Sequence, residues 1–194
     1  LIRSDQARLE NLQRRSRDLS TLDSISSTSK APRNAALDEI REEIEQICAS
    51  WTRSPRFEAL LRRCEKRPLA LALLNRIFQS RAFAAMHQTC PDLPRELLNS
   101  LASIYRRHHS EISALDHTRS AKAKNMCDIS LFCVCRLFEN LNASAISVDM
   151  LTDLADLARR SVSIANTSFR LAVRGMELSK FVSVRLRSVL ARTD

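Results

Sequence analysis

Length, composition and charge narrow the classes of protein to which this chain of 194 residues can belong. Hydrophobic residues make up 44% of the chain and Gly175 is its only glycine, which excludes wholesale disorder, turn-rich sheet folds and nucleotide-binding folds with glycine-rich loops. The formal net charge is +9 and 26 of the 31 basic residues are arginine, which indicates an anionic partner such as nucleic acid, unless the arginine excess only reflects the base composition of the gene.

The first 33 residues are predicted to form a basic arm followed by a polar linker. Leu9, Leu12 and Leu19 make one weak helical stripe among several arginines, and the segment from Ser20 to Lys30 is rich in serine. Arginine and serine are also abundant in mitochondrial targeting segments, although those segments contain few acidic residues and this one contains four. We therefore predict an extended or helical N-terminal arm over residues 1–33 and an all-helical domain over residues 34–194.

The clearest amphipathic helix is predicted over residues 35–51. Its apolar residues recur at intervals of three and four, as one continuous stripe requires. The stripe consists of Leu37, Ile40, Ile44, Ile47 and Trp51. Acidic residues occupy the other side of this helix, and we consider the stripe a candidate docking face for a partner protein.

Further helices are predicted by apolar spacing, with a polar loop and a short helix between residues 108 and 123. The predicted helices cover residues 57–64, 69–86, 93–105, 125–141, 147–158 and 164–190. Ile129–Leu141 is the most apolar run, and Phe132 and Phe138 point to different sides of it, so we expect this helix to be buried among its neighbours. Gly175, inside the last predicted helix, either costs stability or marks a bend or a close contact.

Successive short helices with short connections are typical of stacked helical hairpins, so the predicted fold class is all-α and α-solenoid-like. Three segments have the pattern of such hairpins: RFEALLRRC at Arg56–Cys64, PRELLNSLASI at Pro94–Ile104 and VDMLTDLADLA at Val148–Ala158. In these segments the chain resembles the organellar helical-hairpin repeat proteins of the octotricopeptide and heptatricopeptide class, which bind RNA. The resemblance implies a helical-repeat, RNA-binding protein of mitochondria and assigns a role to no individual residue.

Catalytic and metal-binding patterns are not found in the sequence. Cys133 and Cys135 point about 200° apart on a helix and cannot easily share a metal ion with Cys127. Cysteines within apolar helical patterns are typically small core residues, and the adjacent His108 and His109 are expected to be exposed at a basic helix end. We therefore predict no enzymatic activity, no metal, no cofactor, no small-molecule substrate and no membrane span.

Adjacent arginines recur along the chain and are the candidate RNA-contacting residues. The pairs are Arg14 and Arg15, Arg62 and Arg63, Arg106 and Arg107, and Arg159 and Arg160. The last three pairs fall near predicted helix C-termini, where cations complement the helix dipole. The same placement would line one edge of a helical stack with phosphate-binding groups, and the sequence leaves both interpretations open.

The function hypothesis that follows is a non-catalytic, RNA-contacting component of a ribonucleoprotein assembly, such as a mitochondrial ribosome. Its expected partners are RNA, namely ribosomal RNA, and the neighbouring proteins of a large complex. The alternative is a helical scaffold subunit for other proteins, without nucleic acid, that docks through the stripe from Leu37 to Trp51.

Overall fold

The computed structural model describes residues 2–21, 30–52, 55–90, 92–114, 120–141, 145–166 and 168–190. These ranges contain nine α-helices and no strand, which confirms the all-α prediction. The helices are α1 (Ile2–Thr21), α2 (Lys30–Thr52), α3 (Arg56–Cys64), α4 (Pro68–Ile77), α5 (Arg81–Thr89), α6 (Leu93–Ala114), α7 (Ser120–Glu139), α8 (Val148–Ser163) and α9 (Phe169–Leu190).

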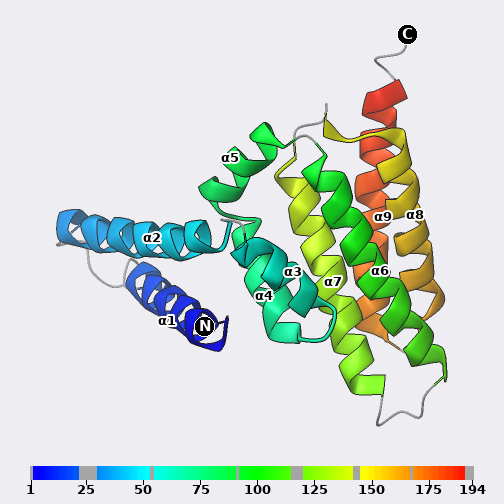
Figure 1. Cartoon of the computed structure of the whole chain (residues 1–194), viewed down its shortest axis with the longest axis horizontal. Coiled ribbons are helices and arrows are strands. Elements are labelled where there is room, and N and C mark those ends of the chain that lie inside the picture. Colours follow the sequence, from blue (N-terminus) through cyan, green and yellow to red (C-terminus); the bar gives the residue numbers. More distant parts are fainter. Residues whose placement is uncertain are drawn as a thin grey trace.

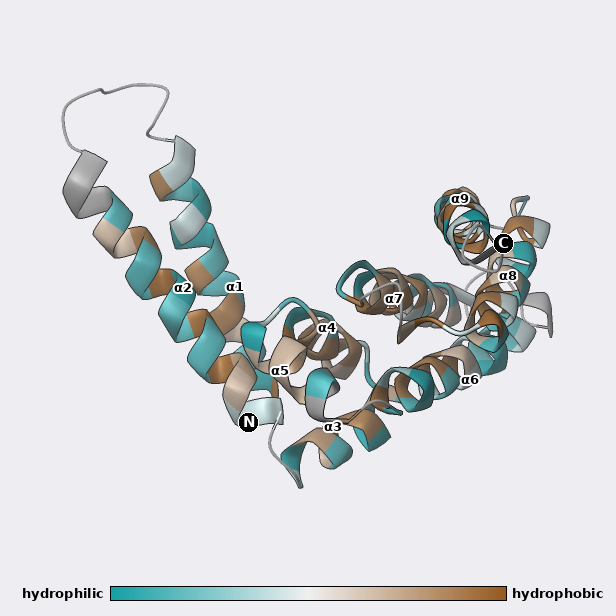
Figure 2. Ribbon diagram, turned by 90° about the horizontal axis from the view of Figure 1, so that it is seen from above, coloured by the Kyte–Doolittle hydropathy of each residue, from teal (hydrophilic) through white to brown (hydrophobic). Residues whose placement is uncertain are grey.

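The helices pair into hairpins that lie side by side in a curved row (Figures 1 and 2). The hairpins are α1 with α2, α3 with α4, α6 with α7, and α8 with α9, and α5 packs on α2. On the inner side of the row α1 contacts α4, α4 contacts α7, and α7 contacts α9, while α2, α3, α6 and α8 lie on the outer side (Figure 2). This arrangement agrees with the predicted stack of helical hairpins.

Helix α7 is the centre of the stack, as its apolar sequence predicts. It packs against α4, α6 and α9, and the side chains of Leu131, Cys133 and Phe138 are fully buried. The Cys133 thiol donates a hydrogen bond to the carbonyl oxygen of Leu71 on α4, at 3.3 Å. Phe132 differs from its neighbours, because it is only half-buried and lies on the inner side of the row.

The single helix predicted over residues 69–86 is wrong, because the chain turns between α4 and α5. Ser80 produces the break: its hydroxyl donates to the Ile77 carbonyl at 2.6 Å and accepts from the Phe83 amide at 3.2 Å. This is the N-cap arrangement that begins a new helix. Phe78 and Phe83 are both buried, with ring centroids 4.8 Å apart, so aromatic packing holds the corner.

Helix α6 extends into the segment predicted to be a polar loop, and it ends at Ala114. His108 is the physical reason, because its side chain is only 10% exposed rather than solvated at a helix end. Its Nδ1 contacts a Glu111 carboxylate oxygen at 2.8 Å, and its Nε2 contacts the Glu65 carbonyl oxygen at 3.3 Å. Together with the buried Ile112, these contacts hold the last turns of α6 against the end of α3.

The N-terminal segment forms a helix that belongs to the stack. Leu9 and Leu12 are 1% and 3% exposed, and Trp51 of α2 donates from its indole nitrogen to Asp5 at 2.8 Å. Residues 22–29 of the predicted serine-rich linker lie outside the described ranges, and the predicted domain boundary after residue 33 falls within α2.

The last helix begins at Phe169 rather than at Ile164, and its glycine marks a close helix contact. A Cβ atom on Gly175 would lie 2.7 Å from the Cβ of Ser161 and 2.8 Å from the carbonyl oxygen of Ala158. Of the alternatives open for this glycine, the close contact is therefore the one that the structure has, since only a residue without a side chain lets α9 approach α8 so closely.

Candidate functional site

The apolar stripe of α2 lies mostly in the core, which leaves little of it exposed for a docking partner. Ile40, Ile47 and Trp51 are 3%, 7% and 3% exposed, and Leu37 and Ile44 are half-buried. The stripe is covered because α1 and α5 both pack on α2. A partner protein would have to displace helices of the chain itself to reach Ile40, Ile47 and Trp51.

The arginine pairs predicted to line one edge lie in different settings. Arg14 and Arg15 are exposed on α1, and the pair at 62 and 63 ends α3. The pair at 106 and 107 lies within α6 rather than near its C-terminus, because α6 is longer than predicted. The pair at 159 and 160 lies near the end of α8, as predicted.

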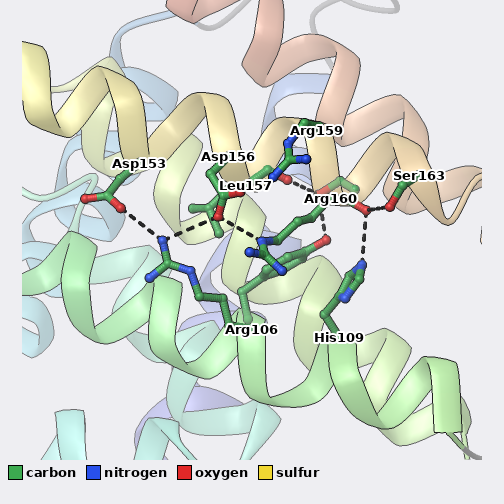
Figure 3. A network of polar contacts seen from close by, with 10 residues as sticks. Arg106, His109, Asp153, Asp156, Leu157, Arg159, Arg160 and Ser163 are labelled. Carbon is green, nitrogen blue, oxygen red and sulfur yellow. Dashed lines mark hydrogen bonds and ion pairs between the residues drawn. The ribbon is translucent and has the colours of Figure 1, made fainter.

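Three of these arginines are neutralised by carboxylates between α6 and α8 (Figure 3). Asp156 accepts hydrogen bonds from Arg160 at 2.8 Å and from Arg159 at 2.9 Å. Arg106 crosses from α6 to bind Asp153 at 2.9 Å and approaches Asp156 to 3.6 Å. The hydrogen bond from Arg160 is the main reason that the pKa of Asp156 is lowered. Arg106 therefore joins α6 to α8, Arg159 and Arg160 pair with Asp156 within α8, and the three positive charges are partly balanced by two carboxylates.

A buried polar pair lies beside this network and has the same structural role. The hydroxyl of Tyr105 is 2.8 Å from that of Ser161, which itself donates to the Leu157 carbonyl at 2.7 Å. His109 contacts the Arg160 carbonyl through Nε2 at 3.1 Å. Burial raises the pKa of Tyr105 to about 12, so its hydroxyl stays protonated at neutral pH.

A second set of cations is exposed at the end of α3 and on the facing surface of α6. We call this set, formed by Arg62, Arg63, Lys66, Arg67 and Arg107, the outer basic patch. The outer basic patch contains two neighbouring hollows. Arg62 and Arg107 line the first, which lies between α3 and α6. Arg62 also lines the second, together with Arg63, Lys66 and Arg67. Arg62 is 3.9 Å from Glu58, with both side chains exposed. The other four cations form no ion pair with any acid in the described part of the chain.

Lys66 and Arg67 were not among the predicted residues. A search for adjacent arginines misses them. The segment from Arg62 to Arg67 nevertheless contains four basic residues, interrupted only by Cys64 and Glu65, and this density of positive charge indicates the patch. Arg107 joins this run only through the fold, because α6 packs beside the end of α3.

No protein family, curated protein or solved structure matches this chain.

The buried thiols are protonated and unreactive at neutral pH. Burial raises the pKa of Cys48, Cys64 and Cys127 to about 12, and it raises that of Cys133 well above its usual range. A protonated thiol is neither a good nucleophile nor a metal ligand. Among the described residues there is no cluster of three or more histidine, cysteine, aspartate or glutamate side chains that could hold a metal ion. In the same ranges, no helix combines the length and apolar character needed to cross a membrane.

Proposed function

We propose that this chain is a non-catalytic, RNA-contacting component of a ribonucleoprotein assembly, and that it contacts RNA phosphates through the outer basic patch. The observation that supports the proposal best is the grouping of five cations, four of which have no acidic partner among the described residues. The dipole of a helix attracts cations to the C-terminal end. Its partial charge of about −0.5 is too small to neutralise several cations, so the patch keeps most of its positive charge. A mitochondrial ribosome is the assembly that the repeat resemblance suggests.

The side chains around the patch favour contact with the backbone of RNA. Asn99, Ser100 and Ser103 line the groove beside Arg107, and such groups donate hydrogen bonds to phosphate and sugar oxygens. No aromatic side chain lines either hollow of the patch. Base stacking, which single-strand binding proteins use, is therefore not available there, and a folded or double-stranded RNA is the better ligand.

The test is the binding of a labelled RNA hairpin at several salt concentrations, measured by fluorescence anisotropy. Neutralisation of five phosphates predicts that the logarithm of affinity falls with the logarithm of salt concentration with a slope of about −3.5 to −4.5. The variant R63Q/R67Q/R107Q should bind more weakly and reduce that slope by about 2–3. These three side chains are exposed and form no ion pair with a described acid, so their loss should leave folding intact.

A matched control separates a local site from the effect of net charge. R14Q/R15Q/K180Q removes the same number of charges from exposed positions on α1 and α9. It should retain most of the affinity and of the salt slope. Equal losses in the two variants would mean that RNA responds only to the overall charge, and the patch would lose its role. Absence of RNA binding by the unmodified protein would favour the protein-scaffold alternative.

A further inference from the structure

The groove between α3 and α6 contains more than the cations of the outer basic patch. The two helices follow one another on the outer side of the row (Figure 2), and the groove between them has a volume of about 450 Å³, in the range of protein sites that hold small ligands. Arg62 of α3 and Arg107 of α6 both line it. Its other lining residues carry no positive charge: Leu61, Glu65, Asn99, Ser100, Ser103 and Ile104. Attraction of phosphate therefore accounts for only part of this groove.

One face of α6 supplies the neutral polar groups. Ser103 lies four residues after Asn99 and three after Ser100, so their side chains share this face, and all three are exposed. None of the three side chains forms a hydrogen bond within the described part of the chain. Ser110, on the same helix, instead donates its hydroxyl to the Arg107 carbonyl at 2.7 Å. The amide and the two hydroxyls in the groove are thus available to a ligand, both as donors and as acceptors.

Glu65 is the residue of the groove that phosphate contacts do not explain. Its side chain is exposed between Arg62 and Lys66 of the patch, yet it forms no ion pair or hydrogen bond with any residue in the described ranges. An ionised carboxylate only accepts hydrogen bonds. A phosphate diester has no hydrogen to donate, and like charges repel, so Glu65 weakens a site that binds phosphate alone. A ligand that suits the whole groove offers an O–H or N–H group to this carboxylate.

The ribose 2′-hydroxyl of RNA meets these requirements. It both donates and accepts hydrogen bonds, so it can donate to Glu65 and accept from the hydroxyl of Ser100 or Ser103. It belongs to the same backbone as the phosphates, which places it beside cations such as Arg62 and Arg107. In a folded RNA the 2′-hydroxyls are displayed along a wide and shallow minor groove, which an exposed helix face can approach.

We infer that the groove between α3 and α6 binds ribose 2′-hydroxyl groups of the RNA whose phosphates lie on the outer basic patch, so that this chain distinguishes RNA from DNA. The inference deepens the proposed function and rests on it. Glu65 accepts a hydrogen bond from the 2′-hydroxyl, and Asn99, Ser100 and Ser103 bind the sugar edge from the α6 side. Because every nucleotide of RNA carries this hydroxyl, the recognition does not depend on base sequence.

The probes are a fluorescein-labelled RNA hairpin and a copy in which fluorine replaces every 2′-hydroxyl. The two hairpins have the same phosphate charge and the same A-form helix, but fluorine cannot donate a hydrogen bond. By fluorescence anisotropy, the unmodified protein should bind the RNA hairpin about tenfold more tightly than the fluorinated copy, as expected when hydrogen bonds that include one to a carboxylate are lost. The salt slopes of the two hairpins should be equal, since the phosphate contacts are the same.

The variant E65A separates hydrogen bonding from charge, because the two explanations predict different results. If Glu65 only repels phosphate, its loss should strengthen binding of both hairpins to the same degree. If Glu65 accepts from the 2′-hydroxyl, the ratio of the two affinities should fall by about threefold or more. The fluorinated hairpin should then bind E65A more tightly than it binds the unmodified protein, because for this ligand only the repulsion is removed.

The variant S100A/S103A tests the α6 side of the groove. It removes two exposed hydroxyls without a change in net charge, and alanine suits a helix interior. Binding of the RNA hairpin should weaken by about fivefold or more, whereas its salt slope should stay the same. The matched control is S179A/S183A, which removes two exposed serine hydroxyls from α9 and should leave both affinities unchanged. Circular dichroism melts check that the variants are folded.

The failure of this inference can be told apart from the failure of the proposed function. Equal affinity of the unmodified protein for the two hairpins would overturn the inference and leave the proposed function standing, because phosphate contacts would then account for RNA binding. An equal gain for both hairpins in E65A would also overturn it, since Glu65 would act only through its charge. Failure of the unmodified protein to bind either hairpin would remove the proposed function and the inference together.

Discussion

Replacement of Gly175 by alanine is the sharpest test of the contact between α8 and α9. In an unobstructed helix interior, alanine is more stable than glycine by about 1 kcal/mol. Here the new methyl group would lie 2.7 Å from the Cβ of Ser161 and 2.8 Å from the Ala158 carbonyl oxygen. That oxygen belongs to the backbone of α8 and cannot rotate away, so the two helices must separate.

The expected magnitude is the difference between these two effects. Overpacking of a close contact costs about 1–3 kcal/mol, and a contact with backbone belongs to the upper part of that range. Ser161 has little freedom to move away, because its buried hydroxyl is 2.8 Å from the Tyr105 hydroxyl of α6. After subtraction of the gain in helix propensity, G175A should lower the free energy of unfolding by about 1–2 kcal/mol. The melting temperature should fall by about 2–8 °C.

Chemical denaturation followed by circular dichroism measures this effect. The matched control is S179A, one turn along the same helix at an exposed position, which should stay within about 0.5 kcal/mol of the unmodified protein. G175A as stable as the unmodified protein, or more stable, would show that helix propensity dominates. The two helices would then not approach as closely as the geometry around Gly175 requires.

Other predictions concern the core and the thiols. Phe138→Ala should cost about 3–5 kcal/mol in the free energy of unfolding because Phe138 is fully buried, whereas Phe132→Ala should cost clearly less because Phe132 is half-buried; denaturation of both variants compares them. Tyr105→Phe should cost about 1 kcal/mol in the same assay, since it removes a buried hydrogen bond to Ser161. In the native protein at neutral pH, a maleimide should modify the exposed Cys90 and leave Cys133 unmodified until denaturant is added, as mass spectrometry will detect.

The parts of the fold that were predicted correctly depend on local information. The scarcity of glycine and the spacing of three and four between apolar residues are properties of short segments, and they identify the all-α class, the stack and the buried α7. The break at Ser80 is also encoded locally, since a serine between apolar helical segments is an N-cap signal, but the spacing of apolar residues alone does not contain it. The position at which α6 ends could not be predicted from nearby residues, because His108 contacts the carbonyl of Glu65, which is far away in the sequence.

The candidate sites could be predicted from the sequence only in part, because their residues come together through the fold. Adjacent arginines were an incomplete guide, because Arg159 and Arg160 lie three and four residues after the aspartate that binds them. That spacing places the charges on one helix face, so this neutralisation was visible in the sequence. The grouping of Arg17, Arg76, Arg136 and Arg174 was not, because these residues come from four separate hairpins and approach one another only through the packing of α1, α4, α7 and α9.

The structural role of Asp156 predicts how stability depends on pH. Hydrogen bonds from Arg160 and Arg159 lower the pKa of this carboxylate, so its contribution to stability is present above the ordinary aspartate pKa of about 4 and is lost as the pH falls through the lower folded value. D156N should therefore destabilise the protein by about 1–2 kcal/mol at neutral pH, because three arginines lose a common partner. The difference from the unmodified protein should shrink in acid, where a protonated aspartate resembles asparagine. D153N is the matched control, since Asp153 is more exposed and Arg106 is its only ion-pair partner among the described residues, and its effect should be smaller. A D156N difference that stays constant from neutral to acidic pH would mean that the ionised carboxylate does not stabilise the contact between α6 and α8.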